Sequence, residues 1–231
     1  MSASKILWKE YKAISHPKTG LKQVHVEVSE ENIYLWTVYL IVVDPDSLYN
    51  GAYLKGQLKF PTNYPYSPPS FKFTPAIYHP NVYMDGRLCI SILHTADNEG
   101  SDEPSSITWS PAQNVESVLL SILSLLEDPN IGSPANVEAS ITYKKKKDAY
   151  IEKVKADVQR SKDRMPEGVV LPTFEELTTK KIEVEDNDDG WWEENYYDDD
   201  EDDEEEEDGD LYEEDNDQDL YEDKSCDETD L

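Results

Sequence analysis

A cysteine follows a His-Pro-Asn turn in the stretch YHPNVYMDGRLCISIL, residues 78–93, where Cys89 lies eight residues beyond Asn81. A thiol is a capable nucleophile near neutral pH, so it needs access more than it needs a base to receive an acyl group from another thioester. Lone cysteines are, however, more often small buried hydrophobic residues. The thiol by itself therefore leaves a catalytic and a structural interpretation open.

Asn81 offers the second group that acyl transfer needs. When an amine attacks a thioester, negative charge develops on the carbonyl oxygen, and a fixed amide N–H close to it lowers the barrier. His79 precedes a proline, which favours extended backbone at that position. His94 follows Cys89 by five residues, but proximity in sequence does not establish geometry. We therefore expect Cys89 and Asn81 to do the chemistry, and we favour neither histidine as a base.

The residues before this stretch alternate as β-strands do. In residues 21–30 and 52–60, apolar side chains alternate with polar ones, whereas residues 35–43 are apolar on both faces, as a central strand is. Residues 70–73, SFKF, indicate a short fourth strand. Four consecutive strands predict an antiparallel meander.

Helical spacing occurs on both sides of these strands. Residues 4–15 and 114–130 place apolar side chains three and four apart, and the second segment begins with an asparagine that can cap it. Residues 135–163 indicate one or two further helices with a break near Asp148, and residues 165–177 an extended segment with two prolines. The predicted fold class is α+β: an N-terminal helix, a four-stranded antiparallel meander and C-terminal helices.

The charge of the chain is concentrated at its C-terminal end. Of the net charge of −30, residues 183–231 carry −28, through 29 Asp or Glu side chains and one Lys. Such runs repel themselves and cannot bury apolar surface, so we expect residues 173–231 to form an extension and a disordered acidic tail. The chain as a whole is 37% hydrophobic, which suits one folded domain, and we assign this domain to residues 1–172.

The cysteines give a first indication of the compartment. Cys89 and Cys226 fall on opposite sides of that boundary, and neither a signal peptide nor a run of eighteen apolar residues occurs. We therefore expect a reduced, soluble, intracellular protein without a membrane or nucleic-acid partner and without a metal.

Four motifs in register resemble the ubiquitin-conjugating enzyme family. They are FPTNYPYSPPSFKF, YHPN, GRLCISIL and WSPAQNVESVLLSILSLLEDPN, in the family's usual order, and the resemblance covers residues 4–165. Each motif alone is weak, but together they favour the catalytic interpretation of the thiol. The resemblance implies that Cys89 carries ubiquitin as a thioester, that Asn81 stabilises the oxyanion or holds the active-site loop, and that His79 braces the turn.

The sequence departs from the family's common pattern around the cysteine. Ser91 and Ser133 stand where many members have acidic residues, which puts in doubt how the incoming lysine is activated. An insertion at about residues 95–106, TADNEGSDEPSS, lengthens the segment between Cys89 and Trp109. Its carboxylates could attract, orient or deprotonate the lysine, or the loop could be a solvated spacer. The acidic side chains of the insertion are Asp97, Glu99, Asp102 and Glu103.

The insertion, the two serines and the acidic tail resemble one subclass, the cell-division-cycle conjugating enzymes that work with cullin-RING ligases. This resemblance implies polyubiquitin chains, joined mainly through one ubiquitin lysine, that direct proteins to the proteasome and serve cell-cycle control. A segment carrying −28 would also associate quickly with a basic partner surface, and its aromatic residues could add apolar anchors. The alternative is a tail that only promotes solubility.

The resemblance further implies partners and a ligase-binding surface. The expected partners are ubiquitin, the activating enzyme and a cullin-RING ligase, contacted through its RING surface and through the tail. Because the activating enzyme uses the ATP, we expect no cofactor here, and we expect the protein in cytoplasm and nucleus. The lysines of the ligase-binding surface could equally form a solvated helix face. The positions that match the family's ligase face are Lys5, Lys9, Tyr66, Ser110, Pro111 and Ala112.

Two other functions are consistent with the sequence. Transfer of another ubiquitin-like modifier is the nearer alternative. The second is a non-catalytic acidic binding protein, against which the presence of Cys89 argues.

Overall fold

The computed structural model describes residues 2–29, 31–95, 104, 106–169 and 171–178. The chain divides into one unit, Met1–Lys181, and another, Ile182–Leu231. The second unit, which holds the predicted acidic tail, lies outside the described residues, and so do residues 96–103 of the insertion. The domain limit at residue 172 and the disorder of the tail stay predictions.

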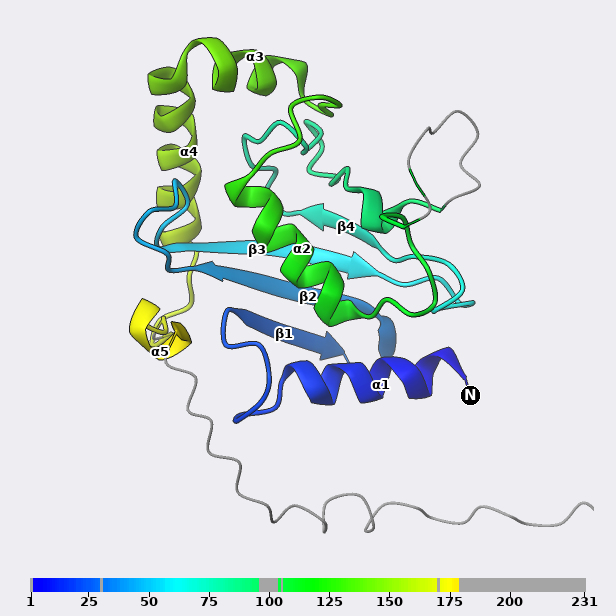
Figure 1. Ribbon diagram of the computed structural model, residues 1–231. Helices are drawn as coiled ribbons and strands as arrows, with labels where there is room; N and C mark the ends of the chain where they lie inside the picture. The colour runs from blue at the N-terminus through cyan, green and yellow to red at the C-terminus, as the bar shows by residue number, and fades with distance from the viewer. Residues whose placement is uncertain (1, 30, 96–103, 105, 170, 179–231) are drawn as a thin grey trace, which may run out of the picture. The chain divides into compact units, whose positions relative to one another are not determined.

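The predicted antiparallel meander is confirmed in the described part of the chain (Figure 1). Its four strands follow each other in the order in which they occur in the sequence. They are β1 (Val24–Ser29), β2 (Asn32–Val42), β3 (Ala52–Lys59) and β4 (Ser70–Phe73).

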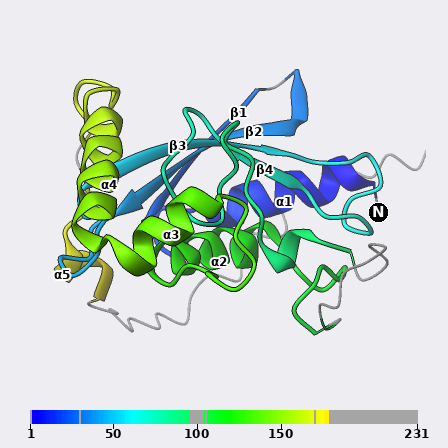
Figure 2. The same ribbon diagram turned by 90° about the horizontal axis from the view of Figure 1, so that it is seen from above.

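Helices cover one face of this sheet. Seen from above, α2 (Val115–Glu127) and α3 (Val137–Lys145) lie on one side of the sheet, and α4 (Lys147–Lys162) lies at one end of it (Figure 2). Leu7 of α1 (Ala3–Ile14) and Ile122 of α2 are both fully buried in the same core cluster, so α1 packs on this face as well. The helices are α1 (Ala3–Ile14), the 3₁₀ turn η1 (Ser91–Leu93), α2 (Val115–Glu127), α3 (Val137–Lys145), α4 (Lys147–Lys162) and α5 (Phe174–Thr178).

Strand β2 is buried on both faces, as its continuous apolar run predicts. Trp36 points into the main core, where its indole N–H donates to the backbone oxygen of Ile33 at 2.7 Å. Tyr39 and Ile41 belong to a separate cluster, which the segment that follows α4 covers through Met165, Val169 and Leu171. The C-terminal part of the described chain therefore closes the second face of the central strand.

The sequence-based helix limits hold closely, and the predicted cap of the second helix is confirmed. Asn114 caps α2, since its side-chain oxygen accepts from the backbone N–H of Ser117 at 2.8 Å. The break between α3 and α4, predicted near Asp148, lies at Lys146. At Lys146 the backbone leaves helical geometry, with φ −140° and ψ 60°.

The prediction of an extended segment over residues 165–177 is wrong at its end, because α5 begins at Phe174. Thr173 and Glu176 cap the N-terminus of this helix through two reciprocal hydrogen bonds. The Thr173 hydroxyl oxygen accepts from the Glu176 N–H at 3.2 Å, while the Glu176 carboxylate accepts from the Thr173 N–H at 2.8 Å. This capping box, Thr-x-x-Glu, is visible in the sequence and marks the start of the helix.

Candidate active site

A tight turn brings Asn81 and Cys89 together. Val82 and Leu88 form an isolated antiparallel bridge, and the N–H of Cys89 donates to the oxygen of Asn81 at 2.9 Å. Gly86 allows the reversal, because its φ is +92° and a Cβ there would lie 2.3 Å from the backbone oxygen of Phe73. The turn Met-Asp-Gly-Arg thus brings the backbone of Asn81 and Cys89 together.

His79 is fully buried and bonded at both ring nitrogens. Its Nδ1 accepts from the backbone N–H of Asn81 at 3.0 Å, so the proton is on Nε2, which donates to the oxygen of Leu125 at 3.1 Å. Burial lowers the pKa of His79 to about 4. A neutral imidazole with both nitrogens engaged suits the bracing role and leaves no nitrogen free to act as a base.

The side chain of Asn81 faces the loop after α2. Its Nδ2 donates to the backbone oxygen of Asn130 at 2.9 Å, and its Oδ1 accepts from the N–H of the same residue at 2.9 Å. The amide nitrogen carries two hydrogens, of which this arrangement uses one. Asn81 therefore holds the loop after α2, and its oxyanion role stays a prediction.

Cys89 is half-buried and lines a pocket of about 120 Å³. The turn before α2 and the loop after it both contribute to this pocket, so residues distant in sequence meet at the thiol. Ser91 and Ser133, the two serines singled out in the sequence, both line it. The other lining residues are Asn81, Ile90, His94, Leu125 and Asn130.

His94 lies beside the thiol, with its Nε2 3.8 Å from Cys89 Sγ. Proximity in sequence alone could not establish this, because the orientation depends on η1, the 3₁₀ turn that connects the two residues. The backbone N–H of His94 donates to the oxygen of Ser91 at 2.9 Å and closes this turn.

Tyr83 also contacts the thiol, and the sequence reasoning missed it. The charge of the Cys89 thiolate, together with slight burial and a hydrogen bond between the two side chains, raises the pKa of Tyr83. The residue remains 39% exposed. Its position between the His-Pro-Asn turn and the glycine turn was the available signal.

The insertion begins and ends at anchored residues. The backbone N–H of Trp109 donates to the oxygen of His94 at 2.8 Å, and Trp109 is buried. Asp97, Glu99, Asp102 and Glu103 lie outside the described residues. Their role stays a prediction, but the base of their loop adjoins the pocket of Cys89.

The predicted ligase-binding positions are accessible and their loops are tied together. Tyr66 is 76% exposed. The Trp109 indole N–H donates to the backbone oxygen of Pro65 at 2.7 Å, which joins the loop of Tyr66 to the loop that precedes α2. The remaining predicted positions Lys5, Lys9, Pro111 and Ala112 are exposed, and Ser110 is half-buried.

Glu10 connects α1 to both loops. Its carboxylate accepts from the Tyr64 hydroxyl at 2.8 Å and from the N–H of Val115, the first residue of α2, at 2.6 Å. Burial raises the pKa of Glu10. Hydrogen bonds therefore join the helix and the two loops that form the predicted ligase-binding surface.

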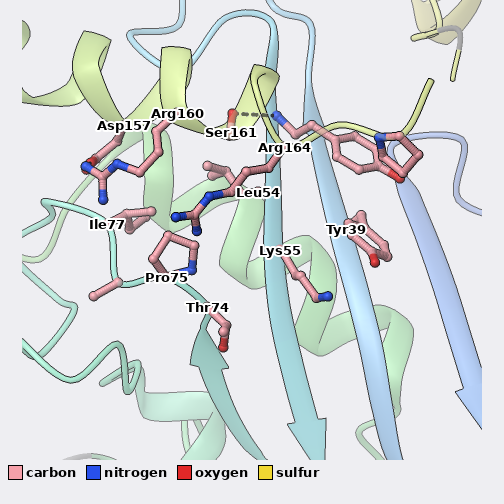
Figure 3. Close-up of a pocket in the computed structure, with 13 residues that line it drawn as sticks. Tyr39, Leu54, Lys55, Thr74, Pro75, Ile77, Asp157, Arg160, Ser161 and Arg164 are labelled. Atoms are coloured by element: carbon pink, nitrogen blue, oxygen red, sulfur yellow. Dashed lines mark hydrogen bonds and ion pairs between the residues drawn. The ribbon is translucent and has the colours of Figure 1, made fainter. Parts of the chain in front are cut away.

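Another pocket, of about 290 Å³, lies where the C-terminal part of α4 meets β3 (Figure 3). Lys55 and Arg164 reach into it, and Arg160 pairs with Asp157. The Asp157 carboxylate is buried and also accepts from the backbone N–H of Tyr78, the residue before His79. Asp157 thus connects α4 to the active-site turn.

Within the described ranges, no group of three or more His, Cys, Asp and Glu side chains is arranged to hold a metal ion. No helix in those ranges has the length and apolar character required to cross a bilayer.

Residues 6–158 match the family model described as "Ubiquitin-conjugating enzyme". The ubiquitin-conjugating enzyme E2-34 kDa of Saccharomyces cerevisiae is 51% identical over 175 residues, which are 75% of this chain and 59% of the yeast protein. Ubiquitin-conjugating enzyme E2 7 of Arabidopsis thaliana is 44% identical over 70% of this chain and 96% of its own length. The ubiquitin-conjugating enzyme E2 of African swine fever virus (strain Badajoz 1971 Vero-adapted) is 44% identical over 72% and 77%, respectively. The match thus spans less than two thirds of the yeast relative.

Proposed function

Since the chain belongs to the ubiquitin-conjugating enzyme family, we propose that it accepts ubiquitin from the activating enzyme as a thioester on Cys89 and transfers it to lysines. The observation that carries this proposal is the half-buried thiol of Cys89 in a pocket beside the clamped amide of Asn81. Sulfur is the nucleophile, and the amide supports the carbonyl oxygen when lysine attacks.

The finer part of the proposal concerns the product and the ligase. The protein builds polyubiquitin chains with cullin-RING ligases, marking proteins for proteasomal degradation and for cell-cycle control. Three features support this: the 51% identity to the yeast 34 kDa enzyme, the serines Ser91 and Ser133 in the pocket of Cys89, and a C-terminal segment with a net charge of −28.

In this proposal the ligase contacts two separate parts of the chain. Its RING domain binds the surface formed by Lys5, Lys9, Tyr66 and the loop of Ser110, Pro111 and Ala112, while a basic surface of the cullin attracts the tail. The connected hydrogen bonds of Glu10 and Trp109 hold the first surface in place before binding. Such preorganisation lowers the ordering cost of association.

The protein uses no cofactor of its own in this proposal, since the activating enzyme spends the ATP, and it works in cytoplasm and nucleus. Expression of a fluorescent fusion and imaging of both compartments tests the localisation.

The product class is tested with a set of ubiquitin variants. The full chain is incubated with activating enzyme, ATP, a neddylated cullin-RING ligase and ubiquitins that each carry one Lys→Arg substitution. We expect one substitution to abolish long chains and the others to leave them unchanged. Equal chain formation with every variant would contradict linkage-specific synthesis. If the protein is charged only by the activating enzyme of another ubiquitin-like modifier, and not by that of ubiquitin, the result would favour transfer of that modifier.

A further inference from the structure

The imidazole of His94 adjoins the atom that must become a nucleophile. Its Nε2 lies 3.8 Å from Cys89 Sγ, a hydrogen-bonding distance for the large sulfur atom. Both side chains line the same pocket, in which Asn81 and Ser133 are neighbours. At this contact a neutral thiol can donate to the imidazole, and an imidazolium can donate to the thiolate.

The backbone holds His94 in this position from both sides. Its N–H donates to the oxygen of Ser91 at 2.9 Å, and its own oxygen accepts from the N–H of the buried Trp109 at 2.8 Å. The first bond closes the turn from Cys89, and the second closes the base of the insertion. The ring is therefore presented to the sulfur by anchored main chain on either side of it.

His79 cannot take this role. Both of its ring nitrogens are bonded to the backbone, of Asn81 and Leu125, and the ring is fully buried. Imidazole is the side chain that changes protonation near neutral pH, and among the described residues of this pocket His94 is the imidazole that reaches the thiol.

We propose that His94 is the acid–base partner of Cys89, an inference that rests on the proposed function. During charging, the Sγ proton moves to His94 Nε2 and Sγ attacks the carbonyl carbon of the thioester on the activating enzyme. The new C–S bond forms, the old C–S bond breaks, and the cysteine of the activating enzyme leaves as a thiolate. The proton then passes from His94 to solvent.

Another titratable side chain faces the pair in the described part of the structure. Tyr83 contacts the thiol from the glycine turn, where Asp85 and Arg87 are paired with each other at 2.7 Å. Its phenol is neutral at the pH values at which imidazole titrates, so it supplies a hydrogen bond and no competing proton acceptor.

The test measures the free thiol, without ubiquitin. Alkylation of the full chain by iodoacetamide is followed from about pH 5.5 to 9.5, and the Cys89 peptide is quantified by mass spectrometry. The Cys226 peptide in the same sample serves as an internal reference. The variants are His94→Gln, which keeps an amide N–H but cannot take up a proton, and His94→Ala. His25→Gln, an exposed histidine on β1, is the matched control.

We expect both His94 variants to alkylate Cys89 about 10-fold more slowly near pH 7, the loss that accompanies one hydrogen bond to a charged group. Above about pH 9 their rates should meet or exceed the parental rate, because a thiolate without a cationic partner is the stronger nucleophile. His25→Gln should follow the parental curve throughout.

The possible outcomes distinguish a proton-accepting role of His94 from a distorted loop and from failure of the proposed ubiquitin transfer. Superimposable curves for the parent and His94→Gln would overturn the proposal, and so would a rate lowered equally at every pH, which indicates a distorted loop. Because no ubiquitin is present, the result does not depend on the proposed function. Absence of a ubiquitin thioester with an intact pH profile would overturn that function alone.

Discussion

The side-chain amide of Asn81 is paired at both ends with the backbone of Asn130, through two hydrogen bonds of 2.9 Å. These two bonds fix the loop after α2 against the active-site turn and use one of the two amide hydrogens. Asn81 can therefore support the loop and still have an amide hydrogen for the oxyanion. Substitution of Asn81 separates these two roles.

Asn81→Ala should discharge ubiquitin to free lysine about 10-fold or more slowly while it is charged at nearly the parental rate. The reason is that negative charge on the carbonyl oxygen develops when the amine attacks and one donor is then missing. Asn81→Asp, of the same size but without the N–H, should be at least as slow. Single-turnover charging and discharge measure the two steps, and equal slowing of both steps in both variants would indicate a collapsed loop instead.

The stability of the protein should fall as the pH is lowered from about 6.5 to 4. Burial lowers the pKa of His79 from its ordinary value of 6.5 to about 4 in the folded state. Between these values the unfolded chain binds a proton that the folded chain does not, so acid favours unfolding. The stability from this group is fully present above about pH 6.5, and its loss amounts to roughly 3 kcal/mol by pH 4.

The contribution of His79 is isolated by comparison with His79→Gln. Urea unfolding at a series of pH values should give a difference in unfolding free energy between the two proteins that shrinks as the pH falls. Glu10 and Asp157, whose carboxyl pKa values burial raises, titrate in both proteins and cancel from the difference. A difference that does not change with pH would contradict the buried neutral state of His79.

Neutralising the four carboxylates of the insertion should leave charging intact and slow chain building. The variant replaces Asp97, Glu99, Asp102 and Glu103 by their amides. The base of this loop adjoins the thiol pocket through His94 and Trp109, so charge in the loop acts near the site of lysine attack. Chain lengths with ligase present, resolved over time, give the readout. Parental chain building would reduce the insertion to a spacer.

Removal of residues 183–231 should not change charging in the absence of ligase, but it should slow association with a cullin-RING complex. The removed segment carries −28, and charge steers encounter over long distances. Raising salt from low to about 0.15 M, where the Debye length is about 8 Å, should bring the intact protein toward the truncated one.

A tail with its aromatic residues changed to serine should recover most of the association rate but dissociate faster, because apolar anchors act on release. Stopped-flow binding at two salt concentrations measures both constants. Equal association rates for the full and truncated chains at low salt would leave the tail as a solubility element.

Much of the fold follows from local pattern. The alternation in β1 and β3, the continuous apolar run in β2 and the capped periodicity of α2 each depend on neighbours within one element, so they predict these elements closely. The strand Asn32–Val42 begins three residues before the predicted apolar run at Leu35, because Asn32 still pairs with Ser29 and Ile33 is buried in the main core.

The candidate site was predictable only in its residue types. Asn81 and Asn130 are far apart in sequence, and nothing local to either residue specifies their pairing. The position of His94 depends on a 3₁₀ turn and on a main-chain bond to Trp109 across the insertion. Contacts of this kind are set by tertiary packing, which hydrophobic periodicity does not encode.

The most direct measurement for the account as a whole is the intact mass of the protein after incubation with activating enzyme, ATP and ubiquitin. We predict an adduct of one ubiquitin that reductant removes from the parent, an adduct that resists reductant in Cys89→Ser, and no adduct in Cys89→Ala. Cys226→Ser should behave like the parent. A reductant-sensitive adduct that persists in Cys89→Ala would place the acyl group elsewhere and contradict the assignment of Cys89 as the carrier.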